Sequence, residues 1–244
     1  MDRHLGSADA MCFACHPGSV GRRSFFAAGA ALLATTVAAP QARAQTAERP
    51  ATPDAALRAL MEGNARYVAN QPRERDFSAR RASLAQSQHP FAAVLGCADS
   101  RVAPELAFDQ SPGDLFVVRV AGNFVTADGL GSLEFGAGVL GTRLILVLGH
   151  TSCGAVNATV DALRQGNTLP GNIAGLATAM KPGIEPALAQ TGGDVTRRAL
   201  VANVQYNVRR LETSSPILTD LIGRGTLAVK GGIYDLATGR VELL

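Results

Sequence analysis

The sequence predicts an α/β fold in which a mostly parallel sheet is flanked by helices. Short apolar runs alternate along the chain with segments whose apolar residues recur at helical spacing, which is typical of βαβ units. Two of these runs end in reactive side chains, at Cys97 and at His150. Ligand sites of open α/β sheets gather at the carboxyl ends of their strands. We therefore expect about four parallel strands, with an antiparallel edge strand after the turn at Thr238-Gly239.

Five apolar runs have the length of strands and are bounded by glycine, proline or polar residues. The first run ends at Gly96, immediately before Cys97, and the third ends at Gly149, immediately before His150. If these two strands are parallel and end side by side, the residues that follow them meet at one edge of the sheet. The predicted strands are residues 91–96, 115–119, 144–149, 227–235 and 241–244.

Helical spacing fills most of the segments between these runs. Asp54 is the expected N-cap of a first helix that continues to Val68, and its single apolar stripe packs either on its own domain or on a second subunit. Asp194 is the expected N-cap of a long helix that ends near Leu211. The Gly-, Pro- and Ala-rich residues 166–193 predict loops with short helices. Shorter helices are predicted over residues 79–88, 129–141, 153–164 and 216–223.

The first 44 residues have the features of a twin-arginine signal peptide. Arg22-Arg23 precede an apolar run that ends near Ala39, and Ala42-Arg43-Ala44 is a small-x-small cleavage signal. We expect this leader to be removed, which leaves one domain over residues 45–244 in the periplasm and no membrane attachment. Retention of the leader as an uncleaved anchor remains the alternative.

The charge balance excludes some classes of partner. The chain has 244 residues with 23 Lys+Arg and 20 Asp+Glu, and the leader accounts for four of the basic and two of the acidic residues. The remaining 19 basic and 18 acidic residues give the predicted mature domain a net charge near zero. Neither nucleic acid nor an anionic membrane surface is expected as a partner.

Four side chains after the first and third strands can form a metal site. Cys97, Asp99, His150 and Cys153 provide two thiolates, an imidazole and a carboxylate, which is a complete tetrahedral set for one zinc ion per chain. A structural disulfide between Cys97 and Cys153 is the alternative, because an exported protein enters an oxidising compartment. Twin-arginine export carries folded proteins, so that zinc can be bound before export.

The position of Arg101 favours catalysis over a purely structural zinc site. Two thiolates and one imidazole leave a fourth position, which either Asp99 or water can take. Arg101 can hold the Asp99 carboxylate in a bidentate pair away from the metal, so that water enters and supplies a hydroxide nucleophile. A closed four-ligand site without chemistry is the alternative, but such a site has no use for this arginine.

These motifs resemble the β-class carbonic anhydrases. The resemblance rests on Cys97-Ala-Asp99-Ser-Arg101 together with Gly149-His150-Thr-Ser-Cys153-Gly154, and it extends over nearly the whole of residues 45–244. It implies the reversible hydration of CO2 to bicarbonate and a proton. It also implies that Cys97, His150 and Cys153 bind zinc, that Asp99 is an exchangeable fourth ligand and that Arg101 is the partner of Asp99.

The resemblance also implies a substrate pocket and an oligomer. Gln88 and Phe116 resemble the residues that line the CO2 pocket, and Phe135 stands where a tyrosine is often found. Val94 replaces a tryptophan that some bacterial members use in an inhibitory bicarbonate pocket, which puts such regulation in doubt. The family implies at least a homodimer, in which the first helix embraces the partner.

Two other classes of function remain open from the sequence. One is a non-catalytic module that binds zinc or bicarbonate on the same fold. The other is a thiol-disulfide protein that uses Cys97 and Cys153. A zinc content near one per chain argues against the second class, and a CO2 hydration assay decides the first.

Overall fold

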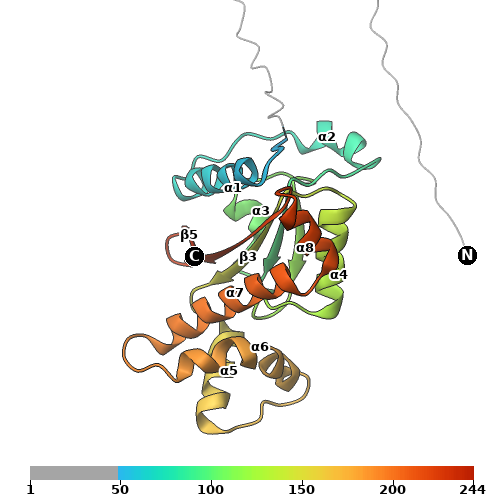
Figure 1. Ribbon diagram of the computed structural model, residues 1–244. Helices are drawn as coiled ribbons and strands as arrows, with labels where there is room; N and C mark the ends of the chain where they lie inside the picture. The colour runs from blue at the N-terminus through green and yellow to red at the C-terminus, as the bar shows by residue number, and fades with distance from the viewer. Residues whose placement is uncertain (1–48) are drawn as a thin grey trace, which may run out of the picture. The chain divides into compact units, whose positions relative to one another are not determined.

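The computed structural model describes residues 49–244, so the predicted signal peptide over residues 1–44 lies outside the described chain. Five strands in this part of the chain form one sheet in the order β2-β1-β3-β4-β5 (Figure 1). The first four strands are parallel, and β5 runs antiparallel to β4 at the edge. The predicted fold class is confirmed. The strands are β1 (Ala92–Gly96), β2 (Leu115–Arg119), β3 (Leu144–His150), β4 (Ala228–Tyr234) and β5 (Val241–Leu243).

The register of the two central strands brings the motifs together. β1 and β3 start level, with Ala92 opposite Leu144, and Gly96 at the end of β1 lies opposite Leu148. Because β3 is two residues longer, its last residue, His150, extends past the end of β1 to the level of the residues that follow Gly96. The predicted juxtaposition of the two motifs therefore follows from strand pairing alone.

Helices connect the strands and cover the sheet. Asp194 caps α7 as predicted, because its carboxylate accepts hydrogen bonds from the Thr196 and Arg197 amides. The predicted cap of α1 was wrong, since Thr52 accepts from the Ala55 amide and Pro53 takes the first helical position. The helices are α1 (Pro53–Val68), α2 (Phe77–Leu84), α3 (Pro104–Ala107), α4 (Ala127–Gly138), α5 (Gly154–Gln165), α6 (Ile173–Leu188), α7 (Val195–Thr213) and α8 (Pro216–Gly223).

The expectation of loops with short helices over residues 166–193 was also wrong, because α6 is a 16-residue helix. Pro182 and Pro186 lie inside it, where each removes a backbone donor. Packing compensates for this loss. Met180 and Ile184 are fully buried, and Gly183 is so close to the Tyr206 ring that a Cβ atom would lie 2.9 Å from the Tyr206 Cβ. A buried apolar face thus overrides the weak helix propensity of the segment.

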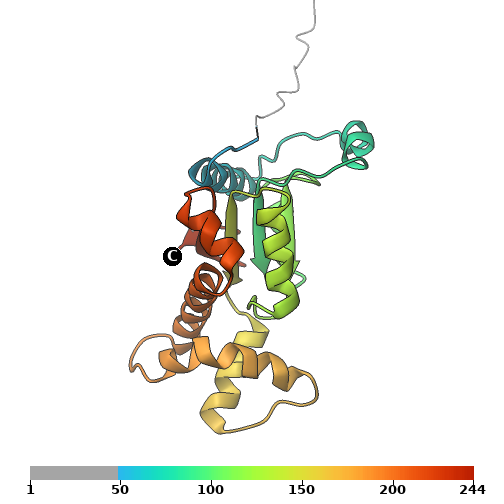
Figure 2. The same cartoon turned by 45° about the vertical axis from the view of Figure 1, so that its right-hand side comes forward.

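The core has two parts, one on each face of the sheet. Successive strand residues point to opposite faces, so Ala93 and Leu95 of β1 pack in one cluster, whereas Ala92 and Val94 pack in the other. The first cluster includes residues of α4, α5, α6, α7 and α8, and the second includes residues of α1 and the end of α3. Helices therefore cover both faces. In Figure 2, α4 and α8 lie on one side of the sheet, with α5 and α6 beyond its lower end.

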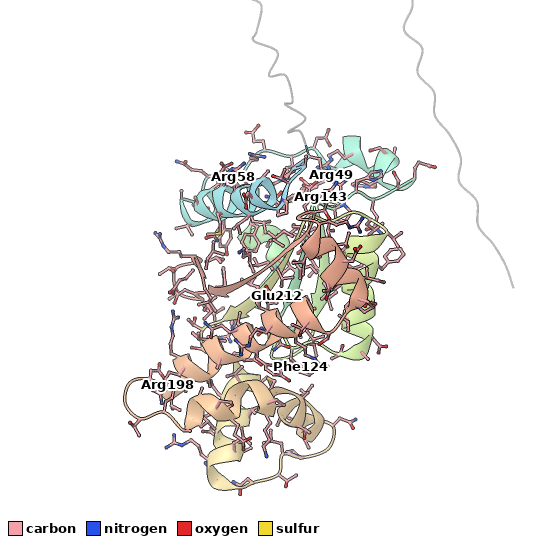
Figure 3. All side chains as sticks on the ribbon, in the orientation of Figure 1. Arg49, Arg58, Phe124, Arg143, Arg198 and Glu212 are labelled. Atoms are coloured by element: carbon pink, nitrogen blue, oxygen red, sulfur yellow. The ribbon has the colours of Figure 1, made fainter. Side chains whose placement is uncertain are left out.

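The two ends of the strands have different surroundings. α1 and α2 lie toward the end where the strands begin, and α5 and α6 lie beyond the tips of the strand arrows (Figure 1). Arg143, which directly precedes β3, and Phe124, which follows β2, mark these opposite ends (Figure 3). Within residues 49–244, no helix is long and apolar enough to cross a membrane.

Candidate metal centre

Three buried side chains meet at the carboxyl end of β1 and β3. Cys97 follows β1, His150 ends β3, and Cys153 is the N-cap of α5. Their ligand atoms all lie within 4.8 Å of one another. The Ser152 backbone has a φ of +55°, a left-handed conformation that turns the chain sharply between β3 and α5. This turn places Cys153 back against His150.

The spacing of these atoms fits a zinc ion. Two thiolates that bind zinc tetrahedrally, with Zn–S bonds of about 2.3 Å, have sulfur atoms about 3.8 Å apart. The Cys97 and Cys153 sulfur atoms are 3.9 Å apart, far longer than the ~2.05 Å of a disulfide bond. Both cysteines are free. The sulfur positions thus favour the predicted metal site over the alternative disulfide.

The imidazole of His150 is oriented for a metal. Its Nδ1 lies 2.9 Å from the Thr151 carbonyl oxygen, and since a carbonyl can only accept, Nδ1 carries the proton. The other nitrogen, Nε2, is buried and has no hydrogen-bond partner among residues 49–244. A buried acceptor without a partner is costly, and a metal ion at this position would satisfy it.

The charges around the three side chains are strongly coupled. The hydrogen bond from Cys153 lowers the pKa of the Cys97 thiol to about 4, and the same contact raises the pKa of Cys153. Burial alone would lower the pKa of His150, but the neighbouring Cys97 outweighs burial and raises it. The contact between the two sulfur atoms therefore favours a thiolate on Cys97 and a thiol on Cys153. A divalent cation would allow both thiols to ionise.

Asp99 is paired with Arg101 beside the three ligands. The Arg101 Nε atom donates to Asp99 Oδ1 at 2.9 Å, and Nη2 donates to Oδ2 at 2.7 Å, which makes the predicted bidentate pair. The Arg101 amide also donates to Oδ1. These hydrogen bonds hold the pKa of Asp99 well below its usual range. Asp99 Oδ2 is 3.8 Å from the free Nε2 of His150, so the carboxylate lies at the edge of the metal site.

The structure adds a further arginine that was not predicted to act at the site. Arg119, the last residue of β2, donates to the backbone carbonyl oxygens of Cys97, Asp99 and Val102 at 2.7 to 2.9 Å. It therefore ties the loop that carries Cys97 and Asp99 to the neighbouring strand. The position of Arg119 at the carboxyl end of a predicted strand indicated that it lies near the site. The sequence alone does not predict which backbone carbonyls Arg119 binds.

The three residues predicted to line the substrate pocket lie elsewhere in the same chain. Gln88 is exposed and precedes β1, so it lies at the end of the sheet opposite Cys97. Phe116 pairs with Ala93, four residues or about 13 Å before Cys97 along the strand direction. The ring of Phe135, on α4, lies 6.5 Å from the Phe116 ring and is 47% exposed. One chain does not bring these side chains to the metal ligands.

Comparison with known proteins identifies the family. A carbonic anhydrase family model matches residues 92–241. A carbonic anhydrase of Mycolicibacterium smegmatis is 45% identical over 193 residues, which cover 78% of this chain and 93% of that protein. The structure of the Coccomyxa β-carbonic anhydrase in complex with acetazolamide is 30% identical. It has a TM-score of 0.61 over 69% of this chain and 78% of that one. The chain belongs to the β-class carbonic anhydrases.

Membership of the family assigns the enzyme class and the cofactor. β-Carbonic anhydrases are zinc-dependent lyases that act on CO2 and bicarbonate, and the Cys97–His150–Cys153 cluster fits their zinc site. A Sordaria macrospora structure described as a tetrameric β-carbonic anhydrase has the same fold, with 25% identity and a TM-score of 0.60. The match covers 77% of this chain and 95% of that one. The predicted fold, enzyme class and cofactor are thus confirmed for this β-carbonic anhydrase.

Proposed function

We propose that this chain hydrates CO2 with Cys97, His150 and Cys153 as the zinc ligands and with the Asp99–Arg101 pair controlling the fourth metal position. Zinc bound there would lower the pKa of a bound water and supply the hydroxide that attacks CO2. The observation that carries the proposal is the bidentate Asp99–Arg101 pair, which stands 3.8 Å from the unpartnered Nε2 of His150.

The pair has two roles in this proposal. Arg101 holds the Asp99 carboxylate away from the ligands, because both oxygen atoms are engaged by one guanidinium. Asp99 remains ionised, since those hydrogen bonds lower its pKa. An ionised carboxylate only accepts hydrogen bonds. Asp99 would therefore orient a bound molecule that has an O–H donor and would disfavour one that has no donor.

The competition for the fourth position should make the activity pH-dependent. At low pH the carboxylate competes only with neutral water, and at high pH it competes with hydroxide. Two thiolates also donate charge to zinc. The pKa of a zinc-bound water should therefore be higher here than the pKa of ~7 found when three histidines bind the zinc. We expect activity to be small at mildly acidic pH and to rise into the alkaline range.

The test is CO2 hydration against pH for the wild type and Arg101→Ala, with zinc content measured in each. Arg101→Ala should retain zinc but lose most of its activity, because Asp99 then loses its partner. A wild-type profile that is flat from about pH 6 to about pH 9 would contradict the proposal, as would an Arg101→Ala enzyme as fast as the wild type.

A homodimer or a higher oligomer is the proposed active form. Gln88, Phe116 and Phe135 can line the metal site only if a second subunit supplies them, because they lie far from Cys97 in their own chain. A test mixes inactive Gln88→Ala and His150→Ala chains after dissociation. In an equimolar mixture about half of the dimers are mixed and each has one intact site, so recovery of up to about one quarter of the wild-type activity would support shared sites, and no recovery would argue against them.

Export to the periplasm also remains a proposal, carried by Arg22-Arg23 and the Ala42-Arg43-Ala44 signal. Replacing both arginines of the pair by lysine should leave unprocessed protein in the cytoplasm. If this lysine variant gave a normal periplasmic yield of protein that begins near Gln45, the export proposal would be contradicted.

A further inference from the structure

A loop between β2 and α4 hydrogen-bonds one of the metal-binding sulfur atoms. The Gly122 amide donates to the Cys97 sulfur at 3.3 Å. Hydrogen bonds to a thiolate stabilise its charge and fix its direction, so this amide is part of the environment that any bound metal would experience. The position of the Gly122 backbone therefore matters to the metal site, although Gly122 has no side chain to contribute.

The conformation of this loop needs support from outside. Gly122 has a φ of +88°, and the next residue, Asn123, has a φ of +43° although it is not a glycine. Two consecutive residues with positive φ are seldom stable alone and persist only where surrounding contacts determine them. The Gly122–Cys97 hydrogen bond therefore depends on the contacts that hold this loop in place.

Side chains along one face of α7 supply that support. Asn203 is fully buried, and its Nδ2 donates to the Gly122 carbonyl at 2.9 Å. Asn207, one turn later, accepts from the Val125 amide and donates to Asn203 Oδ1. Arg210 donates to the Val125 carbonyl at 2.8 Å. Asn203 is the member of this set that acts on Gly122 itself.

A side chain of α6 also packs against Gly122. A Cβ atom at this position would lie 2.3 Å from the sulfur of Met180, which is 1% exposed. Gly122 is thus contacted both by the packed Met180 side chain and by the Asn203 amide. If Asn203 is replaced, the Gly122 carbonyl loses its hydrogen bond from the Asn203 side chain. The loop can then move away from the Cys97 sulfur.

We propose that Asn203 is a positioning residue for the metal site, which acts through Gly122 on the Cys97 sulfur. The inference rests on the proposed ligand set, since it assumes that Cys97 binds zinc. Loss of a group that orients a metal ligand typically weakens metal binding by ~10- to 100-fold. Asn203 should therefore affect zinc affinity in addition to folding.

Asn64 provides a matched control for a purely structural effect. It is also a buried asparagine, and its amide makes three hydrogen bonds, to the Ala107 and Gly239 carbonyls and from the Val241 amide. None of these partners belongs to the metal site. Asn64→Ala should therefore destabilise the fold as much as Asn203→Ala does, or more, without a specific effect on the metal.

The experiment measures the zinc dissociation constant of the full chain by competition with a chelating dye, for the wild type, Asn203→Ala and Asn64→Ala. Unfolding of each metal-free protein is measured in parallel, and so is the thiolate-to-cobalt absorption of the cobalt-loaded proteins. Asn203→Asp is the second variant, because it keeps the size of the side chain and loses the donating amide.

We expect both Asn203 variants to bind zinc ~10- to 100-fold more weakly and to shift the cobalt band, with Asn64→Ala within about twofold of the wild type. Asn203 variants that bind zinc as tightly as the wild type would overturn the inference. So would an Asn64→Ala protein that loses as much affinity. A wild-type protein that binds no zinc would instead overturn the ligand assignment itself.

Discussion

Gly122→Ala should destabilise the protein by about 2 to 5 kcal/mol. A residue with a Cβ atom at positive φ costs roughly 1 to 2 kcal/mol, and Gly122 has a φ of +88°. The new methyl group would also lie 2.3 Å from the Met180 sulfur and 3.0 Å from its Cε. Overpacking of a closed core costs about 1 to 3 kcal/mol more. Met180 is flexible but buried, so it has little space in which to move.

Gly166→Ala separates the two causes. Gly166 caps α5 with a φ of +68°, and a Cβ atom there would meet nothing within 4 Å. Only the backbone contribution applies, so the expected loss is about 1 to 2 kcal/mol. Gly166 also lies outside the metal site. We therefore expect its zinc affinity to match that of the wild type, whereas Gly122→Ala should bind zinc more weakly.

The assay is urea unfolding of the metal-free proteins at one protein concentration, because oligomer stability depends on concentration. Zinc affinity is measured on the same samples. A Gly122→Ala protein that unfolds at the same urea concentration as Gly166→Ala would refute the argument, because the contact with Met180 would then have no energetic effect.

Two other predictions concern the metal ligands and acid stability. His150→Ala should purify without zinc, and a chelator that lowers the melting temperature of the wild type should leave the variant unchanged; full zinc occupancy would exclude His150 as a ligand. The Asp109 carboxylate is 1% exposed and is paired with Arg66 and Arg75, so Asp109→Asn should cost about 2 to 4 kcal/mol at pH 7. Burial alone would raise the pKa of Asp109, but the two arginines outweigh it and lower that pKa. The stability from Asp109 is therefore present above pH ~4 and lost as pH falls through the folded-state pKa. The gap between the urea midpoints of wild type and variant should therefore narrow from pH 7 to about pH 3, and a gap that stays constant would contradict this.

The residues that could be predicted to meet are those that follow strands. Cys97 and His150 each come directly after or at the end of an apolar run, and parallel strands align their carboxyl ends. Local sequence and a general rule of sheet topology were therefore sufficient to predict that Cys97, His150 and Cys153 lie together and that Asp99 pairs with Arg101. The same reasoning could not place Gln88, which lies at the opposite end of the sheet from Cys97 in its own chain and would reach the metal site only in the proposed oligomer.

Other features depend on tertiary contacts that no local pattern reports. The segment of α6 has the composition of a loop, and its packing against α5, α7 and the core explains why it forms a helix. Likewise, the spacing of Asn203 and Asn207 places them on one face of α7, beside apolar residues such as Val204. Nothing in that spacing says that the face meets the loop after β2. From the sequence alone, these two asparagines cannot be distinguished from ordinary polar residues of a helix.

The metal site therefore has two sets of groups, the proposed ligands and the groups that orient Cys97, and the two sets differ in how far the sequence predicts them. The proposed ligands come from the ends of β1 and β3 and from the start of α5, which lie close together because β1 and β3 are neighbouring parallel strands in the sheet. The groups that orient Cys97 come from β2 and α7, through Arg119 and through Asn203 with Gly122. These orienting groups hydrogen-bond to backbone carbonyls and use a backbone amide. They therefore fix the position of Cys97 and do not change which atoms bind the metal. Substitutions in these groups should change how tightly zinc is held while the identity of the ligands stays the same.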